Sequence, residues 1–292
     1  MASSLAGLAM LIVGLLPMTT PAQAGLTGRM LIAGYGPELP QLQDLGKAFE
    51  KSHPGTAVDF QWDRNVKAVD LVLGGVADLA VADQSVPSLR ETRIAWDGIA
   101  VIVNFANPIR EVTSRQLRDL FTGRLTRWSD LGGSSGKVEV LERPPDDNIK
   151  AGFESSLGIS DRIFRPAAVI RSDQKALRAV SGNTSAITYL SLSAALKAQE
   201  DGIPVHILTV DHVEPGLPTV KDGSYALRRP VYLLSREQAG PMVEAFLAFA
   251  RSSEAAAILQ TVFVPAGTSA SRGSQSLGLM GPSPREGADK GS

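Results

Sequence analysis

The sequence predicts an α/β protein whose two lobes enclose a cleft. Apolar strand-like runs alternate with helix-like patterns along most of the chain, which is typical of sheets covered by helices. The apolar, β-branched run at residues 99–103 is typical of a buried strand and is expected to end the first lobe. Asn107 and Pro108 break this strand, and the elements of the second lobe are expected after them. The strand-like run at residues 205–210 is expected to lead back. Two crossings between two groups predict a clamshell that closes on a small ligand.

Length and composition limit the possible classes of function. A chain of 292 residues with 43% hydrophobic residues can form one large core or two smaller ones, and it does not have a disordered composition. The formal net charge of -1 does not indicate a nucleic-acid-binding protein, which usually has an excess of basic residues. The absence of cysteine excludes disulfides, thiolate metal ligands, a catalytic cysteine and a lipid-anchored N-terminal cysteine.

The N-terminus predicts export. Residues 5–16 form an apolar run that is short for a membrane span, and Ala22-Gln23-Ala24 has the small-residue pattern of a signal cleavage site. We therefore expect residues 1–24 to be a secretory signal peptide, although no lysine or arginine precedes the apolar run. An N-terminal membrane anchor is the alternative. The mature protein is expected to be periplasmic or secreted, without stable membrane insertion.

The first lobe is assigned to residues 25–104 and is expected to contain a parallel sheet covered by helices. Its strands are expected at residues 30–33, 56–62, 79–82 and 94–103, and its helices at residues 39–49 and 66–73.

The second lobe is assigned to residues 105–204, with a return to the first lobe over residues 205–265 and a disordered tail over residues 266–292. Thr113 is a candidate N-cap, and Gly123 follows the helix that it begins. Further strands are expected at residues 137–141 and 186–190, and further helices at residues 149–157, 176–180, 191–199, 241–251 and 252–261.

Ligands of open α/β sheets bind outside the carboxyl ends of the strands. Two predicted loops lie at such ends, namely Gly34-Tyr35-Gly36-Pro37 and Asp83-Gln84-Ser85. The first also precedes a helix, whose N-terminus favours anions. The alternative reading of this loop is that its glycines only make the turn.

Several segments resemble one family of proteins. These segments are DGIAVIVN at residues 97–104, TSRQLRDLFTG at residues 113–123, WSDLGG at residues 128–133, the strand at residues 186–191 and the region of residues 213–233. They resemble the phosphate-binding-protein family, the exported solute receptors of phosphate ABC importers. The resemblance implies a two-lobe periplasmic-binding-protein fold, similar to type II, that binds phosphate or a related oxyanion in the interlobe cleft. It also implies the importer's membrane subunits as partners, no cofactor and no enzymatic activity.

The loops that hold the anion in that family are altered in this chain. Tyr35 is the only hydroxyl in the first loop, which also contains Pro37 and Glu38, and the second loop lacks the family's arginine. The third loop keeps Arg143, but Asp147-Asn148-Ile149 stands where the family has hydroxyl residues and glycine. A like charge near a poorly solvated anion costs several kcal/mol. The candidate ligand-binding residues are Gly34, Tyr35, Gly36, Asp83, Gln84, Ser85, Arg143, Asp147 and Asn148.

Other readings of these residues stay open. Asp147 could be an N-cap and nothing more, and Arg143 could be exposed or part of an ion pair. The chain could be a diverged scaffold that acts as a sensory or interaction partner. It could also bind a cationic or neutral solute through Glu38, Asp83 and Asp147.

Enzyme motifs are missing from the sequence. The three histidines are scattered, and neither a zinc-protease motif nor a G-x-S-x-G elbow is present. The glycine- and serine-rich residues 133–137 lack the spacing of a phosphate loop. We therefore predict no metal and no catalytic residue.

Overall fold

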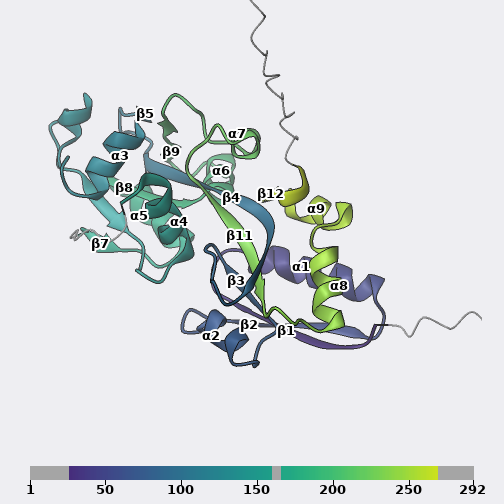
Figure 1. Cartoon of the computed structure of the whole chain (residues 1–292). Coiled ribbons are helices and arrows are strands. Elements are labelled where there is room, and N and C mark those ends of the chain that lie inside the picture. The colour runs from purple at the N-terminus through teal and green to yellow at the C-terminus, as the bar shows by residue number, and fades with distance from the viewer. Residues whose placement is uncertain (1–25, 160–165, 269–292) are drawn as a thin grey trace, which may run out of the picture.

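The computed structural model describes residues 26–159 and 166–268. The predicted signal peptide and the tail beyond residue 268 lie outside the described residues. Figure 1 shows two groups of elements with β4 and β11 running between them. This arrangement confirms the predicted two-lobe α/β fold.

The first lobe contains the elements from both ends of the chain. They are β1 (Gly28–Gly34), α1 (Leu39–Ser52), β2 (Thr56–Trp62), α2 (Ala68–Leu73), β3 (Leu79–Ala82), β11 (Arg228–Ser235), α8 (Pro241–Phe249), α9 (Ser253–Leu259), β12 (Val264–Pro265) and the 3-10 helix η2 (Ala266–Thr268). The predicted tail therefore begins with three residues of regular structure.

The second lobe contains the middle of the chain. Its elements are β5 (Glu111–Val112), α3 (Ser114–Phe121), η1 (Trp128–Leu131), β6 (Glu139–Glu142), α4 (Asn148–Leu157), β7 (Ala168–Val169), α5 (Asp173–Ser181), β8 (Ala186–Ser191), α6 (Leu192–Glu200), β9 (Val205–Ile207), β10 (Thr209–Val210) and α7 (Leu217–Asp222). The strand β4 (Arg90–Asn104) belongs to both lobes.

One sheet extends through both lobes in the order β2-β1-β3-β11-β4-β8-β6-β7, and β9 and β12 also pair with β4. The strands β1, β2 and β3 are parallel, as predicted. The sheet of the first lobe also contains an antiparallel strand that the prediction of a parallel sheet did not include, because β11 is antiparallel to both β3 and β4. The two strands that cross between the lobes run in opposite directions, so the sheet is mixed.

The core of the first lobe lies on both faces of the sheet. Side chains alternate along β1, so Met30 and Ile32 pack against α1, α8 and α9, whereas Ala33 packs against α2. Leu42, Leu45 and Phe49 form the predicted apolar face of α1. This packing holds the carboxyl ends of β1, β2 and β3 at one edge of the sheet.

The hydrophobic clusters divide within the crossing strands. Ala95 packs in the hydrophobic cluster of the first lobe, whereas Ile99 packs in the cluster of the second lobe. On β11 and just before it, Val231 packs in the cluster of the first lobe and Leu227 in the cluster of the second lobe. We therefore propose that the crossings lie at residues 97–99 and 227–229.

These positions differ from the crossings that the sequence predicts, which are near residues 104–107 and 203–211. The run at residues 205–210 does not lead back to the first lobe, because β9 pairs with the second-lobe part of β4 and β10 pairs with β5. The predicted end of the first lobe, residue 104, is the last residue of β4. A strand of 15 residues is long enough to contribute to both cores.

Candidate functional site

Residues of both lobes line a cavity of about 440 Å³, which we call the basic compartment. The loop after β1 and the end of β2 form one side, and the segments after β6 and β7 form the other. The lining residues are Tyr35, Gly36, Pro37, Trp62, Asp63, Arg64, Arg143, Arg171, Ser172 and Asp173. Three arginines face two aspartates there, so this compartment favours an anion.

A second cavity of about 690 Å³ also lies between the lobes, and we call it the acidic compartment. Tyr35 and Arg64 line both compartments. The charged residues of the acidic compartment are Arg64, Lys67, Asp70, Asp83, Asp146 and Asp147. Four carboxylates against two cations disfavour an anion in this part of the cleft.

The lobes contact each other beside these compartments. Asn148 Nδ2, at the start of α4, donates to the carbonyl oxygen of Tyr35 over 3.1 Å. Arg64 Nη2 lies 3.9 Å from Asp146 Oδ1 and donates to the Tyr35 hydroxyl over 3.0 Å. Tyr35 and Arg64 therefore join the first lobe to the loop that precedes α4.

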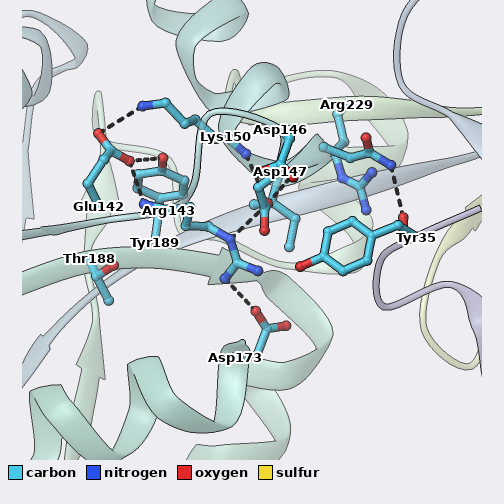
Figure 2. A network of polar contacts seen from close by, with 12 residues as sticks. Tyr35, Glu142, Arg143, Asp146, Asp147, Lys150, Asp173, Thr188, Tyr189 and Arg229 are labelled. Carbon is cyan, nitrogen blue, oxygen red and sulfur yellow. Dashed lines mark hydrogen bonds and ion pairs between the residues drawn. The ribbon is translucent and has the colours of Figure 1, made fainter. Parts of the chain in front are cut away.

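A buried ion cluster surrounds Arg143 (Figure 2). Its Nε is 2.8 Å from Asp147 Oδ1, and its Nη1 is 2.8 Å from Asp173 Oδ1. Burial opposes the charge on Arg143, but the two aspartates outweigh it and raise the pKa of the guanidinium. Asp147 and Asp173 therefore use much of the charge that Arg143 could offer a ligand.

Asp147 is the N-cap of α4, as predicted. Its Oδ1 accepts the backbone N–H groups of Ile149 and Lys150 over 3.0 and 3.4 Å. The Asp147 carboxylate thus occupies the positive end of α4, where anions commonly bind. Its other oxygen, Oδ2, is buried and has no hydrogen-bond partner among the described residues.

A second buried ion cluster surrounds Arg229 on β11. Its Nη2 donates to Asp97 Oδ2 over 2.8 Å and also to Glu38 Oε1. Burial raises the pKa of Asp97 from 3.8 to about 6, although Arg229 lowers it. Glu38 thus pairs with a buried arginine, which explains how an acidic residue is tolerated beside the predicted anion loop.

Asp83 follows β3 and lines the acidic compartment. Its Oδ2 is buried and lacks a hydrogen-bond partner among the described residues. Burial raises the pKa of Asp83 from 3.8 to about 6, Arg229 lowers it, and Glu38 and Asp147 raise it further. Asp83 is therefore the carboxylate of the cleft with the least compensation.

The glycines of the first loop have packing roles. A Cβ on Gly34 would collide with the ring of Trp62, whose Nε1 donates to the carbonyl oxygen of Gly36 over 3.0 Å. Gly36 has φ +133°, and a Cβ there would collide with the Glu38 carboxylate. Gly34 therefore leaves room for Trp62, and Gly36 permits the turn that buries Glu38.

The structure brings most of the candidate residues to the cleft. Tyr35, Gly36 and Arg143 line the basic compartment, and Tyr35, Asp83, Gln84, Asp147 and Asn148 line the acidic one. Gly34 and Ser85 line neither compartment. Ser85 is exposed.

Sequence reasoning missed Arg64, Arg171 and Ser172. Arg64 follows β2 at the same sheet edge as Gly34 and Asp83, so the carboxyl-end rule could have found it. Arg171 and Ser172 follow β7, which has only two residues and gives no strand signal in the sequence.

Within the described parts of the chain, no group of three or more histidine, aspartate or glutamate residues could hold a metal ion. Over the same residues, we find no helix with the length and hydropathy that crossing a membrane requires.

Curated relatives of this chain are phosphate-binding proteins. PstS 2 of Streptococcus agalactiae is 32% identical over 111 residues, which are 36% of this chain and 38% of that protein. The chain thus spans little more than a third of the first of these relatives. PstS of Bacillus subtilis is 21% identical over 78% of this chain and 77% of the relative.

Solved structures have the same fold. An ABC-type phosphate transport receptor from Vibrio cholerae superimposes with a TM-score of 0.71 at 25% identity, covering 82% of this chain and all of that one. A phosphate-bound, putative substrate-binding protein from Clostridium perfringens gives the same TM-score at 23% identity, over 82% of this chain and 99% of the other. These similarities confirm the predicted resemblance to phosphate-binding proteins and the two-lobe fold.

A family model also matches most of the chain. Residues 19–254 match the model of a PBP superfamily domain. This range includes the parts of both lobes that line the two compartments. Because the match covers most of the chain, the chain belongs to the PBP superfamily.

Proposed function

We propose that this chain is an exported solute receptor that binds phosphate or a related oxyanion between its lobes and delivers it to the membrane subunits of an ABC importer. The basic compartment carries the proposal, because Arg64, Arg143 and Arg171 come from both lobes and converge on one cavity. The similarity to phosphate-binding proteins supports the same class of ligand. Export rests on the predicted signal peptide at residues 1–24, and no catalytic step is required.

Binding requires that the lobes close over the solute. Each lobe supplies one or two of the arginines, so an anion in the basic compartment attracts both lobes at once. Arginine is suited to this role because its planar guanidinium can donate two parallel hydrogen bonds to an oxyanion. The contact between Asn148 and Tyr35 lies beside this compartment and is expected to stabilise the closed arrangement.

Isothermal titration of the mature protein with phosphate, sulfate, molybdate and tungstate tests this function. We expect micromolar or tighter binding of at least one of them. The acidic compartment motivates a competing outcome, in which an organic cation binds and Asp83→Asn weakens it. In a second competing outcome, no solute binds and a pull-down with the mature protein captures a membrane protein, which would indicate a sensory or interaction role for the chain. Either competing outcome would reject the oxyanion receptor.

A further inference from the structure

Two helices of the cleft, α1 and α4, begin next to carboxylates of this chain, whereas α5 begins at the hydroxyl of Ser172. Asp147 Oδ1 accepts two N–H groups of α4 and the Nε of Arg143. Glu38 precedes α1 and is buried against Arg229. An external anion at either position would meet a buried negative charge, or would have to displace a carboxylate that already has partners.

Donor groups without a partner line the basic compartment instead. Arg171 makes no hydrogen bond or ion pair with another described residue, and Arg64 Nη1 is buried without a hydrogen-bond partner there. Ser172 Oγ accepts the N–H of Lys175, which leaves its own O–H available to donate. Arg64, Arg171 and Ser172 thus offer donors that no described residue of the chain satisfies.

The same cavity has an apolar wall and the size of an organic ligand. Trp62, Tyr35 and Pro37 line it, and the hydrogen bond from Trp62 Nε1 to Gly36 fixes the indole. Its volume of about 440 Å³ lies in the range of about 300–1,000 Å³ that is usual for small-molecule sites. A single tetrahedral ion would leave much of this space and the aromatic wall unused.

We propose that Arg64, Arg171 and Ser172 hold the anionic group of an organic oxyanion, whose flat apolar body lies against Trp62 and Tyr35. The proposal rests on the proposed receptor function and names the chemical class of its ligand. Because the Asp147 carboxylate accepts the free N–H groups at the start of α4, we expect inorganic phosphate to bind less tightly than such an organic oxyanion.

Titration calorimetry of the mature protein with phenyl phosphate and with inorganic phosphate tests the proposal. We expect phenyl phosphate to bind at least about tenfold more tightly, because it fills the aromatic wall as well as the anion position. Arg171→Gln should weaken phenyl phosphate binding by about tenfold or more through the loss of a charged hydrogen bond. Arg178→Gln is the matched control, because Arg178 is exposed on α5 and lines neither compartment.

Asp147→Ser gives an independent test of the internal carboxylate. It removes the negative charge at the start of α4 and keeps a hydroxyl that can cap the helix. We expect the affinity for inorganic phosphate to rise at least about tenfold in this variant, with a smaller change for phenyl phosphate.

The outcomes separate this inference from the receptor function. If inorganic phosphate binds more tightly than phenyl phosphate, or if Arg171→Gln binds phenyl phosphate as the unmodified chain does, the organic ligand class is wrong and the receptor function stands. If neither compound nor any other oxyanion binds, both proposals are wrong.

Discussion

Replacement of Asp83 by asparagine should stabilise the ligand-free protein at neutral pH. In the folded chain the pKa of Asp83 is about 6, against 3.8 for the free group, and burial is the main cause. The folded state therefore binds this proton more tightly than the unfolded state does. The stability contributed by Asp83 is fully present below about pH 4 and is lost as the pH rises through about 6.

The magnitude follows from that difference. About two pH units at about 1.4 kcal/mol each give about 3 kcal/mol. An asparagine side chain does not titrate, so the free energy of unfolding of Asp83→Asn minus that of the unmodified chain should rise by about 2.5 kcal/mol between pH 4 and pH 7.5. Asp97 titrates in the same range, but it is present in both proteins and cancels in the difference.

Urea unfolding at several pH values, followed by tryptophan fluorescence, measures this difference. Asp70→Asn is the matched control, because Asp70 is exposed in the same compartment and its replacement should change stability at pH 7.5 by less than about 0.5 kcal/mol. A difference for Asp83→Asn that stays constant from pH 4 to pH 7.5 would refute the argument that burial outweighs the attraction of Arg229 at Asp83.

Three further substitutions test the local structure by urea unfolding at pH 7.5. Arg229→Met should destabilise the fold by about 3–5 kcal/mol, because Glu38 and Asp97 lose their buried cation, and a loss below about 1 kcal/mol would contradict this. Gly36→Ala should cost about 1–3 kcal/mol because of its positive φ, and an unchanged midpoint would show that the turn can rearrange. Thr113→Ala should cost about 1 kcal/mol through loss of the capping box of α3, whereas Thr113→Ser should retain most of the stability.

The sequence predicts the elements of this fold well where local signals are strong. The N-caps at Thr113 and Asp147 are confirmed, because capping depends on residues only a few positions apart. Strand pairing depends on distant residues, so the antiparallel pairing of β11 with β3 and β4 was not visible. For the same reason, the sequence predicts the first crossing near residues 104–107, several residues after the position within β4 that we propose.

The sequence predicts where the site lies, but it does not predict which of its charged residues pair with each other. Loops at the carboxyl ends of β1 and β3 do lie in the cleft. The sequence could not show that Glu38 pairs with Arg229, since 191 positions separate them. It therefore could not decide whether the acidic residues face a ligand or pair with arginines. The structure shows that Glu38 and Asp147 pair with arginines, and that Asp83 has the least compensation.

The position of Arg229 connects the crossing strands to the cleft. Arg229 and Asp97 are direct register partners on β11 and β4, at the crossings that we propose. Because this pair lies on the two strands that join the lobes, rotation of one lobe about these strands should leave it intact. The contact between Asn148 and Tyr35 joins elements of different lobes, so the same rotation should break it. We therefore expect the pairing of Arg229 with Asp97 to persist in a conformation in which the contact between Asn148 and Tyr35 is broken.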